Sequence, residues 1–593
     1  MNFTSVIASR SSRVTALSVA LIAACGGDGP TRPGGGGEPT VASITVTPSD
    51  VRLTYLGERQ ELTAETRADD GSLISGADLT WTSLAPEIVE VASTGRLEAV
   101  SVGTTEIRVS VGTVKTTVPV EVTQVATEVR LSPGAARLIG AGDTLTFVAE
   151  ARDRGGHTIP SATFTWSSEE PGVANVDEAG RATAVGHGTA ALKAVVGDGV
   201  SGTADVQVVA ATGEGVASVD RALVDLMQRW HVPGLSIAVV EDGRLVVARG
   251  LGLAHPAADE PMRPDHRVRI ASVSKSITAT AILKLVERGD VALDDRVFPD
   301  LLPDLWADAQ PPGDARLADI TVRELLHHQG GWDQFSSGDP MFMSRDVASA
   351  LGVPSPPEAT DIVRYVLARP LDFAPGTSVS YSNFGFSLLA RVIESVTGMP
   401  YETWVRDEIL GPADATGFRI GGSLLADRQA MEVYYSGLGR DASQVASVFD
   451  ALPGQVPLPY GGFYLSPMDG NGGWVGSVVD LVRFAGAVDG RAEDDVISAA
   501  SRDLVAEDPV PLSGGRYGLG WFVDSDGTWH HTGRLPGSAS RLVIRADGLT
   551  YAALLNASDP DEAAFLGDLV STLATATAAV TAWPDRDLFT EFD

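Results

Sequence analysis

The chain has 593 residues, of which 44% are hydrophobic, and a formal net charge of −33. This length and apolar content allow several domains with real cores, and the negative charge disfavours nucleic acid and anionic membrane surfaces as partners. Acidic residues are scattered rather than clustered, which indicates a soluble acidic surface. The single cysteine, Cys25, excludes intrachain disulfides.

Residues 1–24 have the pattern of an export signal, because arginines precede an apolar run over 14–24 that is too short to span a bilayer. The run ends in LIAAC (21–25), which resembles a bacterial lipobox. The resemblance implies lipidation of Cys25, so that acyl chains anchor an exported protein in the bacterial cell envelope. The alternative is an ordinary signal peptide with a chance cysteine. Residues 25–40, rich in Gly and Pro, are predicted to be a flexible tether.

An internal repeat follows, with a period of about 85 residues. FTWSSEEPGVANVDEAGRATAV, from residue 164, repeats the pattern of LTWTSLAPEIVEVASTGRLEAV, from residue 79. Short alternating strands with turn signals predict two β-sandwich modules, 41–123 and 124–210, which resemble bacterial Ig-like group 2 domains. Trp81 and Trp166 occupy equivalent places and are expected in the cores. The modules are expected to act as spacers, since no residue supports binding of carbohydrate or cell wall.

The tetrad Ser272-Val273-Ser274-Lys275 opens an apolar helix predicted over 276–288. Residues three apart lie on one helical face, so the Lys275 amine can lie beside the Ser272 hydroxyl. A partly desolvated lysine can take a proton from serine and make it a nucleophile. The helix N-terminus adds unpaired N–H groups where an oxyanion would form. The alternative is a helix start with an incidental lysine.

Two later segments carry further polar groups. The triplet Tyr381-Ser382-Asn383 follows a Pro-Gly turn and is predicted on a loop that enters an amphipathic helix. His531-Thr532-Gly533 lies in a segment predicted as two strands joined at Asp547-Gly548. Gly533 on a strand marks a place where another group can approach the backbone closely.

Ser-x-x-Lys, Tyr-x-Asn and His-Thr-Gly, in this order, resemble the serine β-lactamase and penicillin-binding-protein superfamily. The closest branch is the class C β-lactamase-related serine hydrolases, which include esterases, D-aminopeptidases and D,D-peptidases. The resemblance runs over residues 216–585 and implies an α/β (α+β) domain, 216–593, with an antiparallel sheet flanked by helices. The whole chain is thus predicted to be multidomain, with two all-β Ig-like sandwiches before this domain.

The resemblance also implies roles for the first two motifs. Ser272 would be the nucleophile and Lys275 its activating partner. Tyr381 would be a general base, with its phenolate stabilised by the nearby ammonium, and would return the proton to the leaving group. Asn383 would orient a carbonyl or amide of the substrate.

The third motif is implied to bind substrate along its strand through His531, Thr532 and Gly533. The backbone N–H groups of Ser272 and Arg534 would form the oxyanion hole. Penicillin-recognising members usually carry Lys where this chain has His531, and a neutral imidazole holds a carboxylate weakly at pH 7. We therefore expect esters or small amides to be preferred over β-lactams, and attraction of carboxylates to grow as the imidazole protonates near pH 6.5.

No cofactor or metal is predicted, because the adjacent pairs His327-His328 and His530-His531 cannot chelate one ion well. His328 is expected to have a structural hydrogen-bonding role. The predicted function is an envelope-anchored serine hydrolase acting through a serine acyl-enzyme on small esters or amides. The alternatives are a β-lactamase or D,D-peptidase, and a non-catalytic envelope protein that binds wall fragments or a partner. The expected partners are a small-molecule substrate and, through the lipid anchor only, a membrane; the oligomeric state stays open.

Overall fold

The computed structural model describes residues 40–592 except 198, 440, 492–494 and 559–562. The predicted signal peptide, Cys25 and all but the last residue of the predicted tether lie outside the described residues. The chain divides into two compact units: residues up to 127 together with 152–159, and the remainder. No helix within the described ranges is long and apolar enough to cross a membrane.

The first Ig-like module consists of short antiparallel and parallel strands whose residues alternate between buried and exposed, as expected for a sandwich. One sheet has the order β2-β10-β9-β6, and the other strands form the sheets β1-β4-β5 and β3-β8-β7. The strands are β1 (Ser43–Thr47), β2 (Val51–Leu53), β3 (Arg59–Glu61), β4 (Thr63–Arg67), β5 (Leu73–Ile74), β6 (Thr80–Ser83), β7 (Val89–Val91), β8 (Arg96–Ala99), β9 (Gly103–Val111) and β10 (Val114–Val122).

The second module repeats this topology, with a sheet of order β12-β19-β18-β15 and the smaller sheets β13-β17-β16 and β11-β14. Its strands are β11 (Ala126–Ser132), β12 (Ala135–Ile139), β13 (Thr144–Thr146), β14 (Val148–Asp153), β15 (Phe164–Ser168), β16 (Ala174–Val176), β17 (Arg181–Ala184), β18 (Gly188–Val196) and β19 (Val200–Val209).

The two tryptophans of the repeat occupy equivalent positions and pack against the two module cores, as the sequence predicts. Each indole covers a glycine turn. A Cβ at Gly95 would lie 2.9 Å from Cζ2 of Trp81, and one at Gly180 would lie 2.8 Å from Cζ2 of Trp166. Both glycines also have positive φ, 88° and 79°. The glycine repeated at each of these turns is thus a packing requirement.

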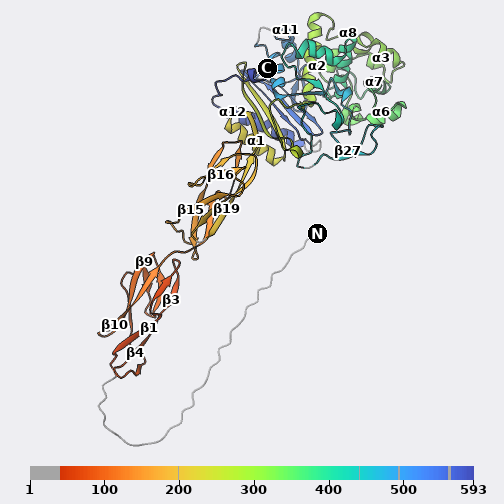
Figure 1. The fold of residues 1–593 in the computed structure, drawn as a ribbon. Helices are drawn as coiled ribbons and strands as arrows, with labels where there is room; N and C mark the ends of the chain where they lie inside the picture. The colour runs from red at the N-terminus through yellow and green to blue at the C-terminus, as the bar shows by residue number, and fades with distance from the viewer. Residues whose placement is uncertain (1–39, 198, 440, 492–494, 559–562, 593) are drawn as a thin grey trace, which may run out of the picture. The chain divides into compact units, whose positions relative to one another are not determined.

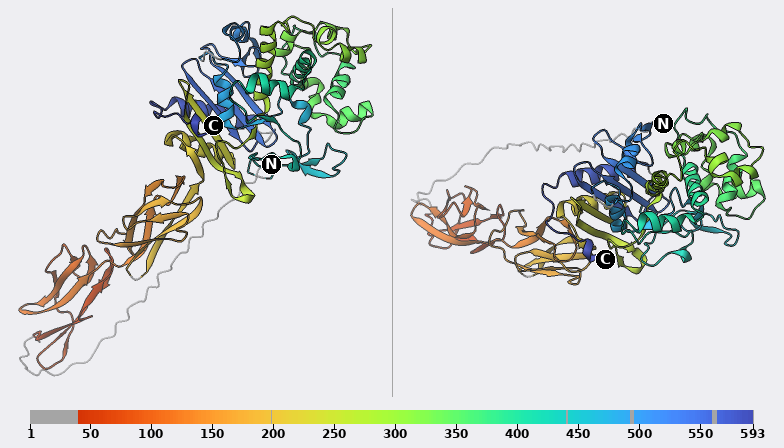
Figure 2. Two further views of the ribbon diagram at one scale, coloured as in Figure 1. Left: turned by 45° about the horizontal axis from the view of Figure 1, so that its top comes forward. Right: turned by 90° about the horizontal axis from the view of Figure 1, so that it is seen from above.

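The C-terminal part is an α/β domain built on a ten-stranded sheet whose main path runs β20-β22-β21-β34-β33-β32-β31-β30-β29. The central strands β33 and β34 are buried along their whole length, because both faces of the sheet are covered. Helices α1 and α12 pack on one face, whereas α2, α8 and α10 belong to the larger core on the other face (Figures 1 and 2). Strand β20 (Ala211–Glu214), which precedes the predicted domain start at 216, pairs with β22.

The remaining elements of this domain follow in chain order. The strands are β21 (Gly234–Glu241), β22 (Arg244–His255), β23 (Glu260–Pro261), β24 (Val268–Arg269), β25 (Arg419–Ile420), β26 (Gln444–Ala446), β27 (Gln455–Pro457), β28 (Trp474–Gly476), β29 (Val510–Leu512), β30 (Gly515–Tyr517), β31 (Phe522–Val523), β32 (Trp529–Leu535), β33 (Ser538–Ile544) and β34 (Leu549–Leu555). The helices are α1 (Ala217–Arg229), α2 (Ser274–Arg288), α3 (Pro303–Asp308), α4 (Val322–Leu326), α5 (Gln334–Ser337), α6 (Ser344–Leu351), α7 (Ala359–Leu367), α8 (Asn383–Thr397), α9 (Tyr401–Val405), α10 (Val478–Gly486), α11 (Ala499–Ala506) and α12 (Ala563–Ala578).

The segment around the third motif contains three strands, so the prediction of two strands is wrong. The turn at Asp547-Gly548 joins β33 to β34 as expected. A second tight turn, Pro536-Gly537, joins β32 to β33, and Gly537 adopts a φ of +82° that it requires. The Pro-Gly dipeptide is itself a turn signal, but the polar residues that follow it resemble a loop and are in fact buried in strand β33.

Candidate active site

The turn that carries Ser272 is held against the third-motif strand. Ser272 lies in a 3-10 turn, η2 (Ala271–Val273), immediately before α2. A Cβ at Gly533 would lie 2.2 Å from the carbonyl oxygen of Ile270, so only glycine allows β32 to come this close. The Ser540 hydroxyl donates a 2.6 Å hydrogen bond to the same carbonyl. The close approach expected at Gly533 is thus present.

Lys275 is fully buried and lies beside the Ser272 hydroxyl. Its Nζ lies 3.2 Å from Ser272 Oγ, 2.7 Å from Asn383 Oδ1 and 2.8 Å from the Asn471 carbonyl oxygen. Burial lowers the pKa of Lys275 to about 7, against the opposing attraction of Asp339. A sizeable fraction of the lysine is therefore an uncharged amine near neutral pH, which can accept the serine proton.

Tyr381 lies against the same lysine, with its ring centroid 4.8 Å from Lys275 Nζ. Burial raises the pKa of Tyr381 well above its ordinary value; a side-chain hydrogen bond with Ser272 opposes this shift, and Asp339 adds to it. The interpretation of Tyr381 as a phenolate stabilised by an ammonium is therefore not favoured by this environment. The structure places a neutral phenol, able to relay a proton, next to a lysine that is the better base.

Asn383 is the first residue of α8, whose N-terminus is capped by the Ser382 hydroxyl. Its Oδ1 accepts from Lys275, and its Nδ2 donates a 2.6 Å hydrogen bond to Asp339 Oδ2. Both polar atoms of the amide are thus engaged within the protein. Asn383 holds the lysine, in addition to the contact with substrate that the sequence predicts.

His531 is buried and uncharged. Its Nδ1 lies 2.7 Å from the Thr532 carbonyl oxygen, so that nitrogen carries the proton, and Nε2 accepts from the Tyr517 hydroxyl at 3.2 Å. Burial, assisted by the charge of Lys275, lowers the pKa of His531 to about 3. The expectation that it protonates near pH 6.5 is therefore wrong.

His328 accepts a 3.1 Å hydrogen bond from the Ser382 N–H, which is the kind of role the sequence predicts for it.

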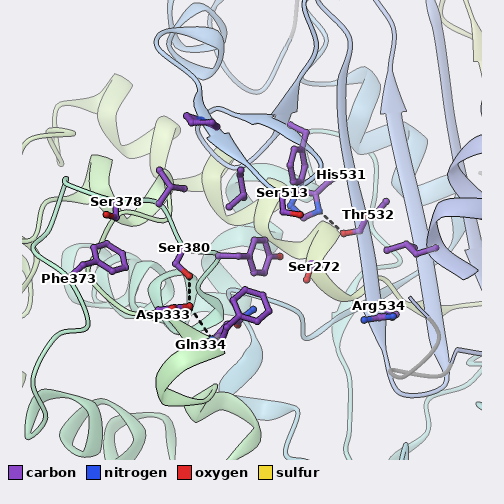
Figure 3. A pocket seen from close by; sticks show the side chains of 17 residues that line it. Ser272, Asp333, Gln334, Phe373, Ser378, Ser380, Ser513, His531, Thr532 and Arg534 are labelled. Carbon is purple, nitrogen blue, oxygen red and sulfur yellow. Dashed lines mark hydrogen bonds between the residues drawn. The ribbon is translucent and has the colours of Figure 1, made fainter. Parts of the chain in front are cut away.

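These groups open onto a cavity of about 950 Å³. Figure 3 shows Ser272 at its floor, between Thr532 and Arg534 on the strand side and Ser380 and Asp333 on the other. Ser272 and Arg534, whose N–H groups are predicted to form the oxyanion hole, both line it. Apolar side chains make up much of the remaining wall: Phe335, Phe373, Pro511, Leu512, Phe522 and Leu566.

The family model described as Beta-lactamase matches residues 219–575. The chain belongs to the β-lactamase family. Before it, residues 77–124 match a bacterial Ig-like domain and residues 154–198 match an intimin immunoglobulin-like domain. The β-modules are therefore Ig-like, and the C-terminal domain is a serine hydrolase of the β-lactamase family.

Relatives of this domain have different names. The chain is 28% identical to Esterase EstB of Burkholderia gladioli in an alignment 381 residues long, which covers 57% of this chain and 90% of the relative. It is 27% identical to Penicillin-binding protein 4* of Bacillus subtilis in an alignment 336 residues long, which covers 55% of this chain and 68% of the relative. A solved structure of D-amino acid amidase from Ochrobactrum anthropi SV3 is 24% identical, covers 61% of this chain and 98% of its own, and gives a TM-score of 0.48.

The sequence motifs do not identify three groups of this β-lactamase-family site: Asp339, the Asn471 carbonyl and Tyr517. Asp339 caps a 3-10 turn in a Gly-Asp-Pro stretch that looks like any other turn. The Asn471 contact is made by the backbone, which side-chain motifs do not report. Nowhere in the described ranges do three or more His, Cys, Asp or Glu side chains form a group that could hold a metal ion.

Proposed function

We propose that this β-lactamase-family hydrolase is an envelope-anchored enzyme that acts through a Ser272 acyl-enzyme on small esters or amides. The observation that carries the proposal is the Ser272–Lys275 contact of 3.2 Å, made by a fully buried lysine whose pKa is lowered to about 7. A serine is a poor nucleophile until a base takes its proton, and this lysine is a base at working pH.

The steps follow from these contacts. Uncharged Lys275 takes the Ser272 proton as Oγ bonds to the substrate carbonyl carbon, and the N–H groups of Ser272 and Arg534 receive the oxyanion. When the tetrahedral intermediate collapses, the Tyr381 hydroxyl gives a proton to the departing oxygen or nitrogen. Tyr381 regains that proton from the Lys275 ammonium. Water then attacks the acyl-enzyme carbonyl as uncharged Lys275 takes a proton from it. The Lys275 ammonium returns this proton to Ser272 Oγ as the acid leaves, which restores the serine hydroxyl.

The cavity supports esters or small amides with an apolar group. Phe335 lines the cavity with 83% of the residue exposed, so an apolar group of a bound substrate would bury its ring. His531 carries no charge to attract a carboxylate. The name of Esterase EstB agrees with an ester substrate. The alternative of a β-lactamase or D,D-peptidase is supported by Arg534, a cation in the cavity wall, and by relatives named penicillin-binding proteins.

A non-catalytic binding protein is the less favoured reading. Ser272, Lys275, Tyr381 and Asn383 are in mutual contact, and such an arrangement has no use in binding alone. The deciding test is covalent labelling with a fluorophosphonate, together with hydrolysis of p-nitrophenyl acetate. Ser272→Ala should abolish both while leaving the fold intact, because no side-chain hydrogen bond caps the start of α2, and loss of even a capping hydroxyl costs at most about 2 kcal/mol. Ser274→Ala, in the same tetrad, is the matched control and should keep both. Undiminished turnover by the Ser272→Ala variant would refute the serine mechanism.

The anchoring proposal rests on the LIAAC run that ends at Cys25. Acyl chains on this cysteine would attach the mature chain to the membrane. Cys25→Ser should therefore move the protein from the membrane fraction to the soluble fraction. Sedimentation of the variant with membranes at high salt would contradict the lipoprotein proposal.

A further inference from the structure

Asp339 lies behind Asn383, on the side away from Lys275. Its Oδ2 accepts from Asn383 Nδ2 at 2.6 Å, and its Oδ1 accepts from the Met341 N–H at 3.1 Å. The second bond caps the 3-10 turn η5 (Pro340–Phe342), which fixes the carboxylate to the backbone. The carboxylate thus has a defined position that does not depend on Asn383.

This contact decides which way the Asn383 amide points. An ionised carboxylate only accepts hydrogen bonds, so Asn383 must turn its NH₂ group towards Asp339. Its carbonyl oxygen then faces Lys275 and accepts at 2.7 Å. With the opposite orientation, an NH₂ group would face the Lys275 ammonium, and donor would meet donor. Asp339 therefore selects the amide orientation that holds the lysine beside Ser272.

Asp339 also faces Lys275 electrostatically. It is the carboxylate whose attraction opposes the effect of burial on this lysine. The other titratable groups around Lys275 do not help, since His328, His531 and Tyr381 are all kept uncharged by burial. Without a nearby anion, the lysine would lose its proton more readily and the ammonium needed after acylation would be less stable.

We propose that Asp339 is a positioning residue for acylation, which fixes the Asn383 amide and sustains the ammonium form of Lys275. This inference rests on the proposed function, because it assigns Asp339 a part in the proton transfers of Ser272. Asp339 itself need not touch the substrate.

The primary test is Asp339→Asn, which removes the charge and keeps the shape. The dependence of kcat/KM on pH is measured with p-nitrophenyl acetate. Loss of the anion lowers the pKa of Lys275, so the acid limb of the profile should move to lower pH, by about half a unit to one unit. The plateau should fall about tenfold, since the amide is no longer forced into one orientation. Asp339→Ala and Asp339→Ser remove the same charge, so any of the three that folds answers the question.

Two control variants distinguish the effect of removing the Asp339 charge from a merely structural effect of the substitution. Asp339→Glu keeps the charge and should keep the acid limb of the unmodified enzyme. Asp339 and Asp372 both line a second cavity, of about 350 Å³. Asp372→Asn removes a carboxylate from this cavity, where Asp372 accepts hydrogen bonds from the Asp333 N–H and the Ser337 hydroxyl, and should leave the acid limb in place. An unmoved acid limb in the charge-removing variants, or the same shift in Asp372→Asn, would overturn the proposal.

A second readout does not require turnover. The chain has four lysines, Lys115, Lys193, Lys275 and Lys284, so the Cε signal of Lys275 can be assigned in ¹³C-lysine-labelled protein by comparison with Lys275→Ala. Its titration midpoint should lie near pH 7 in the unmodified chain and lower in Asp339→Asn. Equal midpoints would refute the part given to Asp339 even if Ser272 acylates normally. Failure of Ser272 labelling with a shifted midpoint would instead refute the proposed function alone.

Discussion

The Ig-like modules and the hydrolase domain bury very different kinds of side chain. The module cores are almost entirely Val, Ile, Leu, Ala and an aromatic, packed by strands with one exposed face. Around Ser272, the hydrolase domain buries a lysine, two histidines and Tyr517, and the ring of Tyr381 contacts both the lysine and one of the histidines. Burying ionisable groups costs stability and shifts their pKa values. That cost is concentrated where the family places its chemistry, whereas the described residues of the modules bury one ionisable side chain, Asp153.

Acid should therefore unfold the hydrolase domain long before the modules. Burial lowers the pKa of His327 and His530 to about 4 and of His531 to about 3. These histidines stay neutral in the folded state but protonate near pH 6.5 in the unfolded state. Above pH 6.5 they therefore leave the free energy of unfolding of the hydrolase domain unchanged, and they lower it as the pH drops from 6.5 towards 4. At about 1.4 kcal/mol per unit and group, the loss by pH 4 is on the order of 5–10 kcal/mol. Asp469, whose pKa is raised to about 6, opposes this with a smaller gain.

Calorimetry of the whole chain between pH 7 and pH 4 would measure this. The first module has no histidine, and the second has two, His157 and His187, neither of which belongs to its core. A thermal transition that survives at pH 4 should belong to the modules. A hydrolase transition as stable at pH 4 as at pH 7 would mean that the buried histidines find compensating partners.

The proton-transfer pair should show the next largest effect. Lys275→Ala and Tyr381→Phe should each lower the acylation rate by about a hundredfold or more, the usual scale of general acid–base catalysis. Both residues move one proton, so the double variant should lose much less than the sum of the two free-energy effects. Single-turnover acylation with p-nitrophenyl acetate measures this. Strict additivity would show that the two residues do not share a task.

The Ig-like repeat can be predicted from the sequence because it rests on alternating strand residues and turn signals. The fold class of the hydrolase domain and the meeting of Ser272, Lys275, Tyr381 and Asn383 are implied by the resemblance of the three motifs to a known family, and the structure brings these residues together. The sequence did not predict the properties that depend on burial by segments far away in the chain. The charge of Tyr381 and the titration of His531 depend on how completely other segments cover them. Asp339 was missed because its link to Lys275 runs through a contact 44 residues away, between Asp339 and Asn383.

His531 offers the finest test of how the buried site selects substrates. We expect p-nitrophenyl acetate to be hydrolysed much faster than nitrocefin by the unmodified enzyme, because His531 has no charge with which to hold a carboxylate. With a pKa of about 3, it should stay neutral across the working range, so lowering the pH to 5 should not change the ratio of the two rates by this route. His531→Lys should raise the nitrocefin ratio by roughly tenfold if about 1.4 kcal/mol of charge attraction is gained. His531→Gln, which adds no charge, should leave the ratio unchanged.

The ammonium introduced by His531→Lys would also repel the Lys275 ammonium, so the acid limb of the pH profile should move to lower pH in His531→Lys. Efficient nitrocefin hydrolysis by the unmodified enzyme would point to Arg534 as the group that holds the carboxylate, and the protein would then act as a β-lactamase.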